Sequence, residues 1–350
     1  MSFLTDAEAA SLRLARMSLH IVSDDEFVAE PELAIEHDDF LLDRIRGVAS
    51  ASVYRFEEVS ATRDTIQSIA CRDVGFEEGA QTLAREFCRF HRGGTRDGAF
   101  FVFELGVEDE NTRIYALMKY DYGQALELVE REGVAGLRRI VEAFVGDKSA
   151  IQKSALVRVV NGAADAEIST RDRMGRPAPD LTDYFIRYLQ VARDRTNGEL
   201  TAAVKEVVRT TLEDHRELLP PGGVAPAVSR ALQVLRNTET VNEDVVNHAV
   251  WMGAGQPADE QVCDSLKKSV GRLVKRKRLA GVTFPPDGGQ LGRPITRVVR
   301  TEEGVTIQYN TGLEGQAVRK IDTADGATQF IVTTRRYTDA VVSESSGRRG

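Results

Sequence analysis

The chain has 350 residues, of which 42 % are apolar and 29 % are charged, a composition typical of a globular protein that folds around its own core. This length suits two domains, or one large domain with an appendage. No run of 18 apolar residues occurs, so we expect no membrane span. Asp6 and Glu8 stand where an apolar block would be needed, so we expect no signal peptide.

Charge is distributed unevenly along the chain. Residues 1–260 carry 30 basic and 45 acidic side chains, whereas residues 261–350 carry 16 basic and nine acidic ones. Ten of the cations lie in Gln261–Arg300, with only Asp264 and Asp287 as acids there. Positive charge concentrated in an acidic protein creates a local field that attracts a polyanion. The alternative is a solvated basic face that has no partner.

The first hundred residues alternate between helical and strand periodicity. In chain order, the pattern predicts a short amphipathic helix within Met1–Arg16, a strand over Met17–Val22, a helix opened by Asp38 and Asp39, a strand over Ala51–Phe56, a helix over Arg63–Cys71 with Thr62 as its N-cap, and a helix over Phe76–Phe90.

Strand patterns dominate the next segment. Gly98–Leu105 and Thr112–Tyr120 are separated by a short polar loop and predict a central hairpin. Leu137–Val145 and Ala155–Val160 read as further strands, although Val134–Phe144 fits a helix equally well. We therefore expect residues 1–170 to form an α+β domain with an antiparallel sheet.

The polar, Pro/Gly-broken stretch Arg171–Asp180 marks the expected boundary to a helical module over residues 171–255. Asp180 is the expected cap of its first helix. The helices expected in the module cover Tyr184–Leu189, Glu199–Leu218, Val228–Leu235 and Asn242–Trp251. Tyr184, Phe185 and Tyr188 have the chemistry of base-stacking platforms, but at helical spacing we interpret them as core residues.

A basic helix should begin at Pro257–Glu260 and reach about Lys277. One of its faces is apolar, formed by Val262, Leu266, Val270, Leu273 and Val274. Lys277 points towards that apolar side, so either the helix frays or the lysine snorkels. The opposite face is cationic, so a rigid helix would present positive charge to a phosphate backbone.

Residues 256–342 should form a small α+β part made of this basic helix and a sheet. Gly281–Arg293 is a Gly/Pro-rich loop, and residues 294–299 fit a helix or a short strand. The expected strands are Gly304–Tyr309, Gln316–Ile321 and Thr328–Thr334, with a turn at Asp325–Gly326 and with Arg319, Lys320, Arg335 and Arg336 on or beside them. We expect residues 343–350 to be disordered.

Three segments resemble the bacterial 37-kDa nucleoid-associated protein family. They are Met17–Val22 (MSLHIV), Met174–Leu189 (MGRPAPDLTDYFIRYL) and Phe284–Thr334, which contains GVTIQY at Gly304–Tyr309. The N-terminal extension and Gly123–Lys153 depart from the family pattern. The resemblance implies a bacterial protein of the cytoplasm that binds DNA in the nucleoid, with no catalytic residues to transfer. Look-alikes of this family also occur beside anti-phage defence genes, so a defence role is an alternative.

No catalytic motif is present: the chain lacks a phosphate-binding loop, a nucleophile elbow and a zinc-protease helix. Cys71, Cys88 and Cys263 are far apart, which is typical of a reducing cytoplasm and predicts neither disulfides nor a zinc site. For a metal-dependent nuclease, Asp121 and an acid set of Asp172, Asp180 and Asp183 are candidate carboxylates, and Glu104 with Lys119 is the one pair with suitable chemistry. We predict a non-enzymatic protein with no cofactor and no metal, and keep nuclease activity as the minor alternative.

The sequence as a whole predicts a protein that binds double-stranded DNA through its phosphates, with weak sequence specificity. The expected contacts are the helix cations followed by a second strip of arginines: Lys267, Lys268, Arg272, Lys275, Arg276, Lys277, Arg278, Arg293, Arg297 and Arg300. A homodimer through apolar stripes of the helical module would double this footprint. The competing hypothesis is a subunit of a defence or regulatory assembly whose basic strip binds a protein partner or phage DNA.

Overall fold

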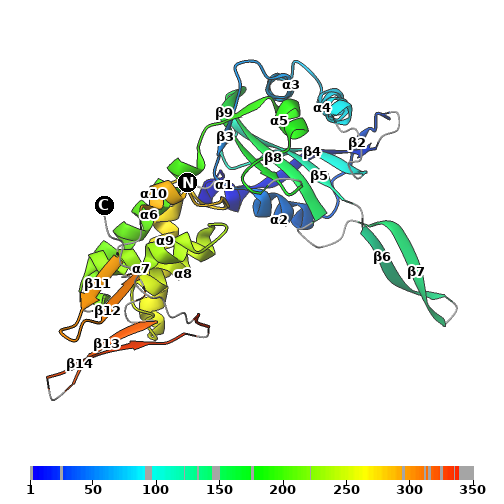
Figure 1. Cartoon of the computed structure of the whole chain (residues 1–350). Coiled ribbons are helices and arrows are strands. Elements are labelled where there is room, and N and C mark those ends of the chain that lie inside the picture. The colour runs from blue at the N-terminus through cyan, green and yellow to red at the C-terminus, as the bar shows by residue number, and fades with distance from the viewer. Residues whose placement is uncertain are drawn as a thin grey trace, which may run out of the picture.

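The computed structural model of the chain describes residues 3–23, 27–90, 97–121, 123–131, 134–143, 150–174, 177–220, 222–293, 296–310, 313, 317–323, 326–334 and 336–338, with the backbone alone for 123–131 and 134–143. The expected disordered tail at 343–350, Arg335 and Asp325 of the expected turn lie outside these residues. The chain is an α+β protein with a large N-terminal sheet and a helical middle region, as the sequence predicted (Figure 1).

An eight-stranded antiparallel sheet forms the first part of the molecule, in the order β10-β3-β9-β8-β5-β4-β1-β2. The expected hairpin of β4 and β5 lies near its centre, and both strands are buried along almost their whole length. The strands are β1 (Arg13–Val22), β2 (Glu32–Leu33), β3 (Tyr54–Phe56), β4 (Gly98–Gly106), β5 (Thr112–Tyr120), β8 (Ile151–Val160), β9 (Ala163–Asp172) and β10 (Val191–Arg193).

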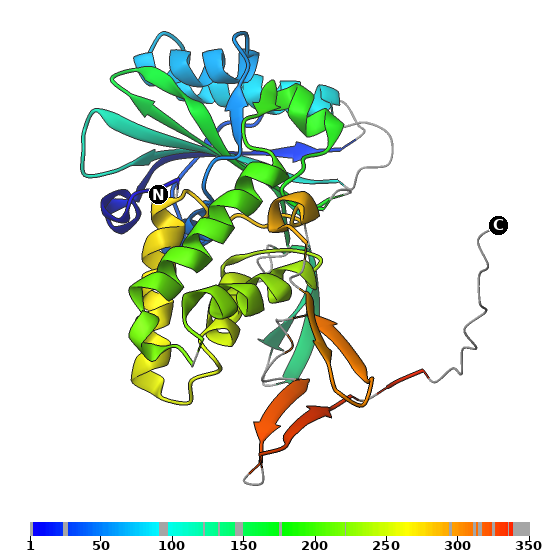
Figure 2. The ribbon, with the colours of Figure 1, turned by 60° about the vertical axis from the view of Figure 1, so that its left-hand side comes forward.

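Helices cover both faces of this sheet (Figure 2). On one face lie α3 (Ala61–Cys71), α4 (Phe76–Phe90) and α5 (Asp183–Leu189), where Phe87 packs against Phe100 of β4 with ring centroids 4.4 Å apart. On the other face lie α1 (Asp6–Ser11) and α2 (Asp38–Val48). Alternate residues of each central strand therefore enter two separate apolar cores, as the period of two in a strand requires.

The helical module consists of α6 (Asn197–Asp214), the 3-10 turn η2 (Arg216–Leu218), α7 (Val224–Arg236), α8 (Glu243–Gly253) and α9 (Glu260–Arg276). Its apolar stripes pack on one another: α6 and α8 both contact α7 and α9. The basic helix α9, which the sequence grouped with the C-terminal strands, is thus one wall of this module. The stripes are thus buried inside the module, and the homodimer expected through them stays a prediction.

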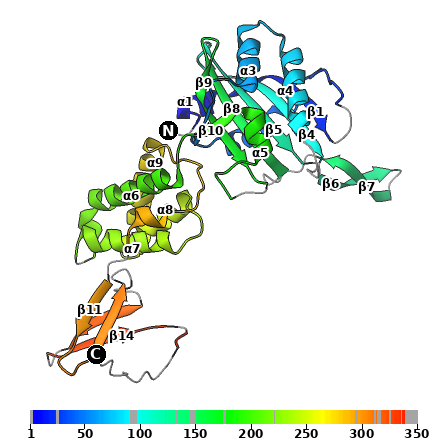
Figure 3. The same cartoon turned by 45° about the horizontal axis from the view of Figure 1, so that its top comes forward.

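Three two-stranded ribbons lie outside the main sheet. One is formed by β6 (Gly123–Arg131) and β7 (Val134–Ala143) and projects from the sheet domain (Figure 1), so residues 134–143 form a strand and not the alternative helix, while Phe144 and Val145 lie outside the described residues. After the short helix α10 (Gly288–Leu291), the C-terminal region forms the other two, namely β11 (Thr296–Arg300) with β12 (Thr306–Asn310) and β13 (Val318–Asp322) with β14 (Thr328–Val332) (Figure 3).

Several local predictions were wrong, each for a physical reason. The N-terminal helix ends at Ser11, because Arg13–Val22 pairs with β4 as a strand. Ser60 and not Thr62 caps α3, since the Ser60 hydroxyl accepts the Arg63 amide at 3.2 Å. The hydroxyl of Thr62 donates instead to the Tyr188 carbonyl.

The first helix of the middle region also begins differently from the prediction. Thr182 occupies the N-cap position of α5, and Asp180 is two residues too early to cap it. The carboxylate of Asp180 accepts a hydrogen bond from Arg193 instead, at 2.5 Å.

Candidate nucleic-acid interface

The basic helix α9 is held firmly at both ends. Asp259 caps its N-terminus, where one carboxylate oxygen accepts the amides of Gln261 at 2.8 Å and Val262 at 3.3 Å. The helix ends at Arg276, and Arg278 turns the chain with a left-handed φ of 56°. Its buried residues are Leu266, Ser269, Val270, Leu273 and Val274, so the apolar face predicted from the sequence is the one that packs on α6 and α8.

The cationic face of α9 points away from this core. Lys267, Lys268, Arg272, Lys275 and Arg276 are all exposed. Lys268 and Arg276 are eight residues apart on the helix, which corresponds to about 12 Å along its axis. A buried stripe therefore holds a cationic stripe of fixed length against solvent.

Four of the predicted contact residues already have acidic partners within the chain. Lys275 contacts Asp6 of α1 at 2.8 Å, and Arg272 lies 3.5 Å from Asp214 of α6. The other two pairs are Lys277 with Glu206 at 2.5 Å and Arg278 with Glu167 of β9. Lys277 does not fray the helix, and its ammonium group does not reach solvent unpaired. Glu206 compensates its charge beside the apolar side of the helix.

Lys267, Lys268 and Arg276 differ from these four. Within the described residues they have no ion-pair partner, and each of them is exposed. They are consequently the cations of α9 that an incoming polyanion meets without displacing a carboxylate of the protein.

Arg278 joins the helical module to the sheet domain. Its side chain pairs with Glu167, and its carbonyl accepts a hydrogen bond from Arg195 at 2.6 Å. The hydrogen bond from Arg278 holds the pKa of the Glu167 carboxyl below its usual value, and the same bond raises the pKa of Arg278. These shifts indicate an ion pair that contributes to the junction, so Arg278 serves structure before any ligand.

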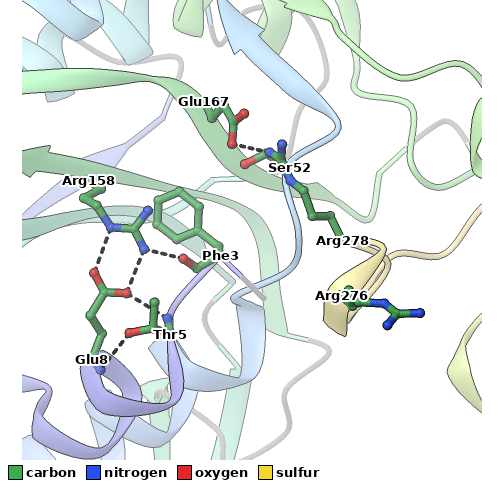
Figure 4. Close-up of a pocket in the computed structure, with 8 residues that line it drawn as sticks. All are labelled: Phe3, Thr5, Glu8, Ser52, Arg158, Glu167, Arg276 and Arg278. Atoms are coloured by element: carbon green, nitrogen blue, oxygen red, sulfur yellow. Dashed lines mark hydrogen bonds and ion pairs between the residues drawn. The ribbon is translucent and has the colours of Figure 1, made fainter. Parts of the chain in front are cut away.

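A cavity of about 380 Å³ opens at this junction (Figure 4). Arg158 forks there to Glu8 of α1 and to the carbonyl of Phe3, while the guanidinium of Arg276 points away from both paired arginines. The remaining lining residues are Thr5, Ser52, Glu167 and Arg278. The two glutamates of the cavity are thus paired with Arg158 and Arg278, whereas Arg276 makes no ion pair there among the described residues.

The arginines predicted as a second strip do not share one surface. Arg293 follows α10, whereas Arg297 and Arg300 lie on β11. Residues three apart on a strand point to opposite faces, and the register places Arg297 opposite Tyr309 and Arg300 opposite Thr306. All three arginines are exposed. One DNA duplex, however, would contact at most one face of this ribbon at a time.

Two of the three aromatic residues of α5 are core residues, as interpreted from their spacing, whereas Tyr184 is half-buried at the edge of the core. Phe185 and Tyr188 are 1 % and 2 % exposed, and both rings lie edge-on against Phe87. They leave no face on which a base can stack.

The structure does not bring together the two residues of the nuclease alternative. Glu104 lies opposite Tyr115 in the sheet, whereas Lys119 is opposite Phe100, four residues further along the same pair of strands. Glu104 is held by Arg72 at 2.8 Å, and Lys119 donates to Gln152 at 2.7 Å. Each member of the pair thus has its own partner.

The acid set also separates. Asp172 is buried and accepts hydrogen bonds from Lys153 at 2.5 Å and from the hydroxyl of Thr182 at 2.7 Å. Asp180 pairs with Arg193. Among the described residues, no group of three or more His, Cys, Asp or Glu side chains is arranged to hold a metal ion.

The buried pair of Lys153 and Asp172 is the feature that sequence reasoning missed. Both side chains are almost fully buried, and Lys153 also lies 4.4 Å from the ring centroid of Tyr184. The only available signal was a lysine inside an apolar strand, and its partner lies 19 residues away. The pair fixes the chain as it leaves β9 and enters α5.

In comparisons with known proteins, no protein-family model matches the chain, and the search of curated proteins found no match. The likeness to the nucleoid-associated family accordingly stays a prediction from the quoted segments. Over the residues that can be described, no helix combines the length and apolarity needed to span a membrane.

Proposed function

We propose that this protein binds double-stranded DNA through the exposed face of α9, without catalysis and with little sequence specificity. The proposal rests on how α9 packs. One face of the helix is buried against α6 and α8, while Lys267, Lys268 and Arg276 are exposed to solvent. Phosphate contacts by such side chains give affinity and orientation but read no bases. Binding to chromosomal DNA would place the protein in the nucleoid of the cytoplasm.

The contact set has two tiers. Lys267, Lys268 and Arg276 bind phosphates directly. Arg272 and Lys275 join them by exchanging a carboxylate partner for a phosphate, because both of their ion pairs are exposed to solvent and therefore weak. Lys277 and Arg278 remain in their structural ion pairs, so they are not primary contacts with DNA.

The test is fluorescence anisotropy of a labelled duplex, titrated at several salt concentrations. A Lys267→Gln/Lys268→Gln variant should weaken binding and flatten the slope of log K against log salt by about 2, since each phosphate contact contributes about 0.9. The matched control is Arg89→Gln/Arg187→Gln, which makes the same charge change on the exposed surfaces of α4 and α5.

The control should leave the slope unchanged. Absence of DNA binding at low salt would refute the proposal and favour the alternative, a basic strip that binds a protein partner. Such a partner would show a shallower salt dependence and a few dominant contact residues. Equal losses in both variants would mean that the net charge, and not α9, determines the binding.

A further inference from the structure

The C-terminal ribbon of β13 and β14 is incomplete as it stands. Two strands alone are marginally stable in water, and in the part of the chain that the structure describes no third strand joins them. Apolar side chains are exposed on both faces of the ribbon. Ile321 and Ile331 lie on one face at 43 % and 41 % exposure, and Val332 lies on the other at 60 %.

The two edges of this ribbon differ in charge. The β13 edge carries Arg319, Lys320 and Asp322, and charged residues of this kind protect an edge strand from pairing with another chain. The β14 edge has the sequence TQFIV over Thr328–Val332, with no charge and no proline. An uncharged, exposed strand with unpaired backbone groups is a template for a further strand.

The other strand edges of the C-terminal region do not share this property. On β11, Arg297 and Arg300 supply charge. On β12, Tyr309 is 7 % exposed and Asn310 donates to Gln233 of α7 at 2.5 Å, so this strand faces the helical module. The described C-terminal strands therefore offer one uncharged open edge, that of β14.

We propose that the β14 edge pairs antiparallel with β14 of a second copy, forming a four-stranded sheet across a two-fold axis. A two-fold interface must be self-complementary, and an uncharged strand meets its own copy without opposing like charges. Pairing all five residues places Phe330 opposite Phe330 of the second copy. The charged β13 strands then form both outer edges, which ends the assembly at a dimer.

This dimer does not depend on DNA binding, so its failure and that of the proposed function are separable. The experiment is light scattering of the full-length chain after size exclusion at micromolar concentration. The wild type should have twice the mass of one chain, and Ile331→Lys should have the mass of a single chain, because the two new lysines would face each other diagonally across the axis. The matched control is Ile321→Lys, which places the same charge on β13 at similar exposure.

The control should remain dimeric. A monomeric wild type, a dimer that persists in Ile331→Lys, or a dimer that both substitutions disrupt would each overturn the proposal. Unchanged circular dichroism would show that Ile331→Lys has not unfolded the chain.

A second measurement locates the axis. Directly opposed residues of an antiparallel pair have Cα atoms about 4.5–5.5 Å apart, which is within disulfide range. In a Cys71→Ser background, which removes the exposed native thiol, Phe330→Cys should form an intermolecular disulfide on mild oxidation. Ile321→Cys should cross-link much more slowly, and equal rates for the two would contradict pairing through β14.

Discussion

The edges of the β-sheets are protected differently at the two ends of the molecule. The eight-stranded sheet ends in very short strands, β2 with two residues and β10 with three, and helices cover both of its faces. The C-terminal ribbons have five-residue strands, open edges and apolar side chains at 40–60 % exposure, such as Ile331 and Val332. The edges of the eight-stranded sheet are thus protected by short strands, whereas the β14 edge lacks such protection, and this contrast underlies the proposed pairing of β14 with a second copy.

Charge follows the same division. In the sheet domain and at the end of α9, several long side chains find acidic partners from distant parts of the chain, such as Arg158 with Glu8 and Lys275 with Asp6. On the ribbons, Arg300 and Arg319 have no ion-pair partner among the described residues. Long-range ion pairs thus join distant parts of the sheet domain and α9, whereas the ion pair described on the ribbons, Lys320 with Asp322, lies within one strand.

The largest effect is expected where the sheet domain depends on a buried ion pair. Asp172→Ala leaves Lys153 buried without its carboxylate, which should destabilise the sheet domain by about 3–5 kcal/mol. The loss should appear as faster amide hydrogen exchange in β8 and β9. Asp322→Ala removes an exposed carboxylate from the β13 ribbon and should leave exchange in the sheet domain unchanged.

A compensating variant separates the ion pair from the packing around it. Lys153→Met/Asp172→Asn removes both charges and should recover much of the lost protection. If amide hydrogen exchange in the double variant is as fast as in Asp172→Ala, the role of the pair is not electrostatic. The contrast between the sheet domain and the ribbons would then not rest on ion pairing.

A smaller effect is expected from acid, again in the sheet domain alone. Burial, reinforced by the charge of Arg85, lowers the pKa of His20 to about 4. The Glu30 amide donates to Nδ1 of His20 and Nε2 contacts the Ser18 hydroxyl at 2.8 Å, so the neutral ring with its proton on Nε2 satisfies both contacts.

The sign of the pH dependence follows from these pKa values. The unfolded chain takes up a proton on His20 near pH 6.5, while the folded chain resists protonation until about pH 4. Stability from this group is thus fully present above pH 6.5 and declines as pH falls towards 4, by at most about 1.4 kcal/mol per pH unit. Unfolding free energies from pH 7 to 4.5 should show this decline in the wild type and not in His20→Gln. Parallel curves for the two proteins would contradict it.

Local periodicity was enough to predict much of the fold. The helix over Phe76–Phe90 and the hairpin of β4 and β5 lie where the apolar spacing predicted them. The apolar stripe of α9 was likewise readable, because four-residue spacing determines which side chains share a helix face. What periodicity could not show was that the stripe packs inside the helical module.

The partners of charged residues were beyond sequence reasoning. Lys275 and Asp6 are 269 positions apart, and only the folding of the whole chain brings α1 beside the end of α9. Four of the ten predicted DNA contacts turned out to have such partners, so a count of cations overstated the charge available to a polyanion. The N-cap at Ser60 was missed for a related reason, since Thr62, two residues later, has equally suitable chemistry.

The smallest effect is expected when acidic partners of the α9 cations are removed, which leaves these cations unpaired like those of the ribbons. Asp6→Asn/Asp214→Asn removes the exposed partners of Lys275 and Arg272 without changing side-chain size. Exposed pairs are worth about 0.2–1 kcal/mol each, so the loss of two such pairs should raise DNA affinity by about twofold to thirtyfold. Glu86→Gln/Glu213→Gln makes the same charge change beside Arg89 and Arg209, and its smaller rise measures the effect of net charge alone. Equal rises in the two variants would show that the carboxylates of α1 and α6 do not compete with DNA for α9. A rise confined to the first variant would show that the chain itself limits how much of α9 a phosphate backbone can reach.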